Sequence, residues 1–343
     1  MVDATHYRFQ AHDRSYFAII KKEIHKLAED AGFVAKKLAD LDLILSEITS
    51  NLHKYSSKGE ILAGIFTEGE NKYIEIIGID HGPGMAHPQK MMEDGVSSSN
   101  TMGLGLGSIK RLSDKFDIYS VKDWGTIVLS RLYNKPLSPR TGSVTRVDIR
   151  PLVIAMPGQV TSGDGTYYKI SDQYFKILVA DGLGHGKDAN HAVNEAVRAF
   201  KSCPFHSPKE LLKFIHQSIR GTRGIVGTIA VFDFTTNKWK IAGIGNISTR
   251  LSNFLDLKNL ISYNGIIGHN IPVIMEDQEI LLSDFHQITF CSDGIQSRWE
   301  YHKFPGINRC DLSIQAAAIY KDFARLTDDT TVIMAKINQN ICS

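Results

Sequence analysis

The stretches Asp80-His-Gly-Pro-Gly84 and Gly103-Leu-Gly-Leu-Gly107 decide the fold of the first part of this chain. The first follows the apolar run Tyr73–Ile79, so Asp80 should stand at the end of a strand, beside a tight turn. The second leads into a helix that we expect to begin near Gly107. Glycines directly before a helix expose backbone N–H groups that bind anionic phosphate. A Gly-x-Gly-x-Gly alone is a weak indication, but in this order the two stretches predict a nucleotide site.

A helix expected over Val34–Tyr55 supplies further polar groups. Glu47 and Asn51 are four residues apart and share one face of it, and Lys54 shares that face too. A carboxylate there can accept a proton from an attacking hydroxyl, and an amide oxygen can hold magnesium bound to phosphates. Lys54 can meet phosphate as a point charge. Taken alone, this spacing is more typical of a solvated helix face.

The turn after Asp80 completes the prediction of an ATP and magnesium site. The Asp80 carboxylate can accept a hydrogen bond from an adenine amino group, and glycines let the ring approach the backbone. An ordinary Asp-x-Gly turn is the alternative. The polar stretch Met85–Asn100 is expected to act as a mobile lid. The residues predicted to bind the cofactor are Asn51, Lys54, Asp80, Gly82, Gly84, Gly103, Gly105 and Gly107, with Glu47 as the base.

The second half of the chain carries a different chemistry. Asp181 and Asp293 each follow an apolar strand and precede a glycine, so each places a carboxylate at a strand end. Together with Asp164 and Asp328 they predict a site for two manganese or magnesium ions, which prefer hard oxygen ligands. Two such ions can activate a bridging water for attack on a phosphoester. A lone histidine is more often structural, so we do not expect His185 to be a ligand.

Composition limits the remaining function classes. The 343 residues include 39 Lys and Arg and 37 Asp and Glu, a formal charge of +2 without the basic excess of a nucleic-acid binder. No apolar run is long enough for a membrane span, and the polar N-terminus does not resemble a secretory signal. The four cysteines lack Cys-x-x-Cys spacing, which indicates free thiols in a reducing cytoplasm.

The hydrophobic patterns predict two domains joined by a linker. We expect an α/β domain over residues 1–134, a linker over 135–146 and a strand-rich α+β domain over 147–343. In the second domain a helix is expected from Pro208, preceded by the capping box Ser207-Pro-Lys-Glu210. Another helix is expected over Ser313–Arg325.

The first domain resembles the Bergerat-fold (GHKL) ATPases and, among them, the small anti-sigma-type serine kinases such as RsbT. The stretches that carry the resemblance are Asn51–Gly59, Met92–Ser99 and Gly105–Leu112. It implies a mixed sheet with helices on one face and MgATP under a lid. It also implies that Glu47 is the base, Asn51 the magnesium ligand, Asp80 the adenine contact and Gly103–Gly107 the phosphate loop.

The second domain resembles the SpoIIE/RsbX branch of the metal-dependent serine/threonine phosphatases. The resemblance rests on Ser162–Gly165, Val179–Gly186, Gly227–Val231, Gly245-Asn246, Ser292–Gly294 and Asp328–Val332. It implies an αββα sandwich in which Asp181 bridges two ions. Asp164 and the Gly182 carbonyl would complete the coordination sphere of one ion, and Asp293 and Asp328 that of the other. Asp329 is not expected to be a ligand.

The two resemblances together imply a bifunctional partner-switching regulator. One domain would phosphorylate, and the other dephosphorylate, a serine or threonine on a STAS-domain antagonist protein. A further partner, either a sigma factor or an upstream sensor, is possible within this interpretation. A homodimer is possible as well. An alternative makes the first domain a nucleotide-gated binding module that transfers no phosphate and controls the phosphatase or sequesters a regulator. A third reading gives the two domains different substrates.

Overall fold

The computed structural model describes residues 5–11, 13–56, 58–88, 105–137, 145–253 and 256–338. Their contacts divide the chain into two compact units. The first unit comprises the described residues of Thr5–Gly142 together with Tyr301–Lys321. The second unit comprises the described residues of Ser143–Glu300 and Asp322–Ser343. In the described part of the chain, no helix combines the length and the apolar character needed to cross a membrane.

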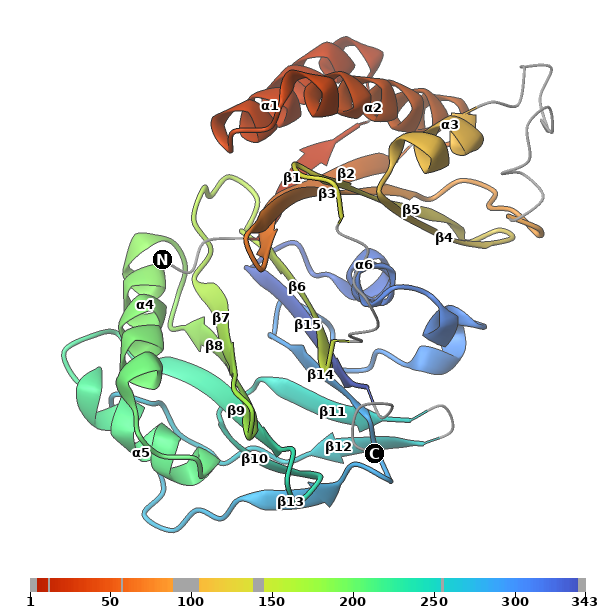
Figure 1. Cartoon of the computed structure of the whole chain (residues 1–343). Coiled ribbons are helices and arrows are strands. Elements are labelled where there is room, and N and C mark those ends of the chain that lie inside the picture. The colour runs from red at the N-terminus through yellow and green to blue at the C-terminus, as the bar shows by residue number, and fades with distance from the viewer. Residues whose placement is uncertain are drawn as a thin grey trace. The chain divides into compact units, whose positions relative to one another are not determined.

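The first unit is built on a five-stranded sheet with the strand order β1-β2-β3-β5-β4 (Figure 1). Every pairing in it is antiparallel, so the expectation of a mixed sheet is wrong. The connections that the structure describes are hairpins or pass through helices that return the chain antiparallel. Its elements are β1 (Tyr7–Gln10), α1 (Phe17–Asp30), α2 (Ala35–Tyr55), β2 (Gly59–Glu68), β3 (Asn71–Asp80), α3 (Gly105–Leu112), β4 (Lys115–Val121), β5 (Gly125–Tyr133) and, up to Lys321, α6 (Leu312–Phe323).

Helices α1, α2 and α3 lie over one face of this sheet (Figure 1). The apolar stripe of α2 packs there, with Leu41 and Leu45 fully buried. Alternate residues of β3, Ile74 and Ile76, point from the sheet into the same core because strand side chains alternate between the two faces. The burial of this stripe fixes which side of α2 faces outward, and Glu47 and Asn51 lie on that side.

The opposite face of the sheet contains a buried ion pair. Glu75 of β3 and Arg131 of β5 are directly opposite each other in the strand register and are 2% and 0% exposed. Arg131 Nε donates to Glu75, and its Nη1 and Nη2 donate to the Asp311 carboxylate at 2.7 Å each. Burial opposes the charge of Arg131, but Glu75 and Asp311 raise its pKa above the ordinary value. The guanidinium is therefore held charged inside the unit.

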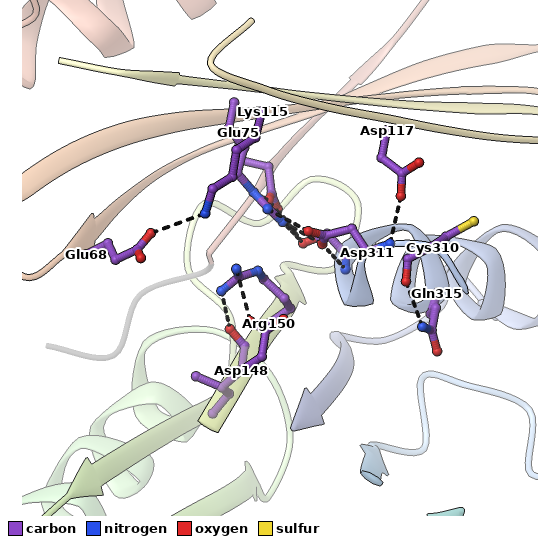
Figure 2. A network of polar contacts seen from close by, with 12 residues as sticks. Glu68, Glu75, Lys115, Asp117, Asp148, Arg150, Cys310, Asp311 and Gln315 are labelled. Atoms are coloured by element: carbon purple, nitrogen blue, oxygen red, sulfur yellow. Dashed lines mark hydrogen bonds and ion pairs between the residues drawn. The ribbon is translucent and has the colours of Figure 1, made fainter. Parts of the chain in front are cut away.

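Asp311 belongs to a segment that is remote in sequence from the sheet. Figure 2 shows it between Glu75 and Asp117 of the sheet and Cys310 of its own segment. The Asp311 backbone N–H donates to Asp117 at 2.7 Å, and the Ser313 hydroxyl donates to Glu75 at 3.0 Å. Residues 301–321, which lie within the range expected for the second domain, therefore pack with the first unit. This sheet is covered on both faces, and not only on one as the resemblance implies.

The second unit is a pair of stacked antiparallel sheets with two helices on one side (Figure 1). Their strand orders are β13-β10-β9-β8-β7 and β12-β11-β14-β15-β6. Its elements are β6 (Val147–Ile154), β7 (Asp164–Ile170), β8 (Tyr174–Gly182), α4 (Lys187–Ser202), α5 (Pro208–Ser218), β9 (Ile225–Asp233), β10 (Lys238–Ile244), β11 (Ser248–Ser252), β12 (Leu257–Leu260), β13 (Gln278–Leu281), β14 (Gln287–Cys291) and β15 (Thr330–Ile337).

Two apolar cores hold these layers together. The first lies between the helices and the sheet of β8, β9 and β10, and includes Val193, Leu211 and Ile229. The second lies between the two sheets, where Phe232 and Phe290 are fully buried. Stacked sheets of this kind bring the ends of strands from both sheets to one edge.

The start of α5 differs from the expected capping box. The Ser207 side chain makes no capping bond and donates instead to Asp277 Oδ2 at 2.6 Å. The backbone N–H of Lys209 donates to the other oxygen of Asp277 at 2.7 Å. The capping-box prediction is wrong because a carboxylate from a distant loop satisfies the free N–H group and also stabilises the helix dipole.

We predict that Arg131→Ala lowers the free energy of unfolding by about 3–5 kcal/mol, because Glu75 would stay buried without its counter-ion. Urea unfolding of the full chain, followed by circular dichroism, measures this loss. The control is Lys115→Ala, since the Lys115 ammonium lies 3.7 Å from Glu68 at a partly exposed position. Its loss is expected to stay below about 1 kcal/mol. Equal losses in the two variants would contradict a structural role for the buried pair.

Candidate functional site

The first candidate site lies where α2 meets the start of α3. A Cβ atom placed on Gly105 would lie 3.0 Å from Glu47 Oε2 and 3.6 Å from Asn51 Oδ1. The structure thus brings three of the predicted residues together, and the absence of a side chain at Gly105 leaves both polar groups accessible. Lys54 is exposed on the last turn of α2.

The glycine loop differs in part from the prediction. Helix α3 begins at Gly105 and not near Gly107, so both of these glycines belong to its first turn. Gly103 lies outside the described residues, as do Met92–Ser99 and most of the expected lid. The N–H groups of a first helical turn have no partner within the helix, so this turn can still donate to an anion.

Asp80 ends β3 beside this helix pair and is largely enclosed. Its Oδ1 accepts backbone hydrogen bonds from Gly82 at 2.7 Å and from Thr126 at 3.2 Å. Burial raises the pKa of Asp80, while these two bonds and the positive charge of Lys321 act in the opposite direction. The side chain is therefore fixed in orientation at the strand end. Sequence reasoning missed Thr126, although Gly125-Thr126 after Trp124 has the pattern of a turn that opens a strand.

The glycines of the Asp80 turn are explained first by packing within the chain. A Cβ atom on Gly82 would lie 2.2 Å from the Tyr55 carbonyl oxygen. Gly84 has a φ of 64°, and its Cβ would lie 1.9 Å from the Val121 carbonyl oxygen. Only glycine fits at these two positions. Their predicted role in letting an adenine ring approach the backbone stays a prediction.

The second candidate site is formed by strand ends of both sheets in the second unit. Asp164 opens β7 and Asp181 lies in β8, directly opposite it in the antiparallel register. Asp293 follows β14, and Asp328 precedes β15, its neighbour in the other sheet. The four predicted aspartates therefore come from two adjacent strand pairs. Opposed residues in such a pair have their Cβ atoms about 5 Å apart.

The aspartates of this site repel one another. Burial, followed by the charges of Asp164, Asp293 and Asp328, raises the pKa of Asp181 to about 10. Burial also raises the pKa of Asp164 to about 7, with Asp293 among the contributing charges. Like-charged carboxylates at such short range cannot all ionise without a counter-charge. The geometry thus creates a strong local demand for positive charge.

The donor set fits hard divalent cations. Asp164 is 2% exposed, and within the described residues its Oδ2 has no hydrogen-bond partner. A buried carboxylate oxygen without a partner is costly unless a cation or a proton satisfies it. In the described ranges no three Asp, Glu, His or Cys side chains converge closely enough to hold a metal ion as the structure stands, so metal binding at this site requires the carboxylates to move together. Gly182 fits closely against α4, where its Cβ would lie 2.5 Å from the Ala189 carbonyl oxygen.

Asp329 has a role that the sequence did not reveal. Its Oδ1 accepts from the backbone N–H of Met156 at 2.8 Å and its Oδ2 from that of Gly163 at 2.7 Å. It is 2% exposed. With both oxygens engaged, it positions the chain that leads into Asp164. Burial raises the pKa of Asp329, and the two backbone hydrogen bonds act in the opposite direction. His185 is exposed.

Asn246, which belongs to the Gly245-Asn246 stretch of the phosphatase resemblance, is a second supporting residue, and its role was not predicted. Its amide donates to Asp293 Oδ2 at 3.0 Å and thereby orients that carboxylate. The signal available in the sequence was its place after Gly245, at the end of β10. Hydrogen bonds from outside a ligand set commonly fix the orientation of its members.

We predict that, without metal, the free energy of unfolding falls as the pH rises from about 4 toward about 10. The pKa values of Asp164 and Asp181 are raised to about 7 and about 10, above those of the unfolded chain. The folded protein therefore binds more protons than the unfolded chain in this window, and stability is lost as they dissociate. Melting temperatures in a chelator at several pH values measure the slope.

The matched variant for this prediction is Asp181→Asn, which removes one charge while keeping the side chain's shape. We expect it to flatten the pH profile and to raise the melting temperature of the metal-free protein at alkaline pH. Added magnesium or manganese should stabilise the wild type most at high pH, because binding displaces protons. A flat profile for the metal-free wild type would contradict the proposed carboxylate cluster.

Comparisons with known proteins match each half of the chain to a different group. Residues 9–131 match the family of the histidine kinase-like ATPase domain. A stretch of 100 residues, 29% of this chain, is 37% identical to the serine/threonine-protein kinase RsbT of Bacillus subtilis (strain 168) and covers 75% of that protein.

Solved structures match the fold of the remaining part. One is a structure described for the bacterial stressosome, a modular system that has been adapted to control secondary messenger signalling. It has a TM-score of 0.51 and 24% identity and covers 56% of this chain and 100% of its own. Another is RsbX in complex with magnesium, with a TM-score of 0.50 and 15% identity over 57% of this chain and 98% of that one.

These findings confirm the two fold classes expected from the sequence. The second unit has the fold of the RsbX-type phosphatases, and at this level of identity the similarity concerns the fold alone. For the first unit the relationship extends to the sequence. Through residues 9–131 the chain belongs to the histidine kinase-like ATPase family and is related within it to RsbT.

Proposed function

We propose that this protein is a bifunctional partner-switching regulator. Its first unit would phosphorylate a serine or threonine of a STAS-domain antagonist protein with ATP, and its second unit would hydrolyse such phosphoesters. The observation that supports the proposal is that one chain brings predicted residues of two different polar sites together. One is the Glu47, Asn51 and Gly105 group, and the other is the cluster of Asp164, Asp181, Asp293 and Asp328.

In the first unit the side chains would divide the work of phosphoryl transfer. Glu47 would accept the proton of the attacking hydroxyl, and Asn51 would hold the magnesium that neutralises the phosphates of ATP. The first turn of α3 would orient the phosphates through its free N–H groups. Asp80, held by Gly82 and Thr126, would accept a hydrogen bond from the adenine amino group. Lys54 would be a further phosphate contact.

In the second unit the aspartates would hold two magnesium or manganese ions, which supply an activated water for attack on a phosphoester. Asp181 would lie in both coordination spheres, with Asp164 and the Gly182 carbonyl on one side. Asp293 and Asp328 would complete the other. Asp329 and Asn246 would keep Asp164 and Asp293 in place through the hydrogen bonds described above. The protein itself would contribute carboxylates whose mutual repulsion a cation relieves.

The partner is inferred from the relatives. RsbT is named as a serine/threonine-protein kinase, and the stressosome appears in the description of one structural neighbour. A STAS-domain protein that is phosphorylated in one state and free in the other would serve both units. Residues 1–134 and 147–343, joined by 135–146, are the proposed domains, with Tyr301–Lys321 packed on the first. A sigma factor would be a further partner downstream, and the cytoplasm is the proposed location.

We predict that purified protein transfers labelled phosphate from ATP to a STAS-domain protein, and that the label disappears when manganese is added. Glu47→Gln is expected to reduce the transfer by about 10²–10⁴-fold, because it removes the proton acceptor while keeping the side chain's shape. Asp181→Asn is expected to abolish the removal of label and to leave the transfer intact. Autoradiography of the partner after electrophoresis measures both reactions.

Each variant is the control for the other, because each should lose one activity only. Transfer that persists in both Glu47→Gln and Asn51→Ala would refute the kinase assignment. Measurable ATP binding without any labelled partner in the wild type would favour the nucleotide-gated binding module. The second unit would then be the only enzyme. Label that appears on one partner and disappears only from another would indicate different substrates.

A further inference from the structure

Residues Tyr301–Lys321, here called the strap, form the middle of the segment that connects two predicted metal ligands, Asp293 and Asp328. Before the strap, Ile295 follows Asp293-Gly294 directly, and after it Arg325 precedes Asp328. The two ends are joined in the second unit by an antiparallel bridge between Ile295 and Ala324. The Arg325 N–H donates to the Gly294 carbonyl at 2.8 Å, and the Gln296 N–H donates to Phe323 at 2.9 Å. We call these paired residues the neck.

The backbone of the neck connects the strap directly to the residues of the aspartate cluster. The carbonyl of Gly294 is held by the neck, and a Cβ on Gly294 would lie 2.0 Å from the Asp329 carbonyl oxygen. The backbone there is packed too tightly to absorb movement locally. A displacement of the neck must therefore move the backbone of Asp293 and of Asp329, and with the latter the support of Asp164.

The other end of this connection is fixed to the sheet of the first unit. Arg131 binds Asp311 through two nitrogens, and Asp117 accepts from the Asp311 backbone. Figure 2 shows Asp311 beside Glu75. The Ser313 hydroxyl donates to Glu75 at 3.0 Å. These are charge-assisted bonds with partners that are largely buried, so the strap is seated in one defined position.

The end of the strap reaches the turn that supports the candidate nucleotide site. The Lys321 ammonium donates to the Trp124 carbonyl at 2.8 Å and lies 3.9 Å from the centre of the Trp124 ring. Phe304, near the start of the strap, packs edge-on against the Trp124 ring, with ring centres 5.8 Å apart. Trp124 is thus held at two points of the strap.

The same turn closes on Asp80 and its glycines. The Asp123 N–H donates to the Pro83 carbonyl at 2.7 Å. A Cβ on Gly125 would lie 2.2 Å from the Asp80 carbonyl oxygen, and Gly84 packs equally closely on Val121. A ligand that moves the Asp80 turn must therefore move Val121–Gly125, which carries Trp124 against the strap.

We propose that the second face of the ATPase sheet is a docking surface for the strap, and that nucleotide binding at the Asp80 turn changes the phosphatase site through it. This inference rests on the proposed function of the two sites. The path runs from Asp80 to Trp124, then through Lys321 and the strap to the neck and Asp293. Because linkage is reciprocal, occupancy of the aspartate cluster changes nucleotide affinity by the same factor.

The first test is hydrogen exchange of the full-length protein with saturating magnesium, with and without a non-hydrolysable ATP analogue. The analogue should change the exchange of peptides that cover the strap and both sides of the neck, in addition to those around Asp80. The second test is the hydrolysis of p-nitrophenyl phosphate, a small probe that needs no partner protein. The analogue should change kcat/KM by about fivefold or more.

Two variants break the connection at different points. Asp311→Ala removes the bond to Arg131 and leaves Arg131 paired with Glu75, and Lys321→Met removes the bond to Trp124. In both, the effect of saturating analogue should shrink to less than about twofold, while hydrolysis without analogue stays as in the wild type. Arg309→Ala is the matched control, since this exposed residue lies in the same strap and should leave the coupling unchanged.

The outcomes separate the inference from the function on which it rests. If the analogue binds but exchange in the strap and the neck does not change, the inference is overturned, whichever activities the protein has. The same holds if the two variants respond to the analogue as strongly as Arg309→Ala. If exchange changes as expected but the wild type hydrolyses no phosphoester, the proposed phosphatase fails and the coupling stands.

Discussion

The first unit depends on one buried charge. Arg131 has no exposed surface, and an unpaired guanidinium there would be prohibitively unfavourable. Its three ion-pairing nitrogens are satisfied by Glu75 from the neighbouring strand and by Asp311 from the strap. The pair with Glu75 could form within the sheet alone. The bonds to Asp311 require a segment that lies far along the chain, so the sheet is complete only when residues 301–321 are in place.

This requirement explains why sequence order and spatial order differ. An apolar sheet face would accept any apolar cover, whereas a guanidinium accepts a carboxylate in a defined orientation. The strap offers Asp311 at the start of α6, followed by Ser313, which also contacts Glu75. The ion pair and hydrogen bonds with Arg131 and Glu75, rather than the amount of buried apolar area, therefore determine which segment packs here and in which register.

The second unit is governed by the opposite kind of constraint. Burial and the charges of neighbouring aspartates raise the pKa of Asp164 and of Asp181, while the charge of Arg325 acts in the opposite direction on Asp293. Around them the backbone is rigid, because Gly163, Gly182 and Gly294 pack against neighbouring atoms with no space for a side chain. The favourable packing of the two apolar cores offsets the cost of holding these repelling carboxylates in place. A bound cation or proton would relieve this repulsion.

The sequence by itself determined the two fold classes and most of the elements that carry the sites. The apolar stripe of α2 and the runs before Asp80, Asp181 and Asp293 were readable because their periodicity is local. The short strands β1, β4, β7, β11 and β12 were not predicted, since their pairing depends on partners elsewhere in the chain. Tertiary structure alone decided that Asp277 caps α5, that Asp329 supports Asp164 and that the strap packs with the first unit. Each of these rests on a hydrogen bond or an ion pair between residues distant in sequence, and no local pattern specifies such a partner.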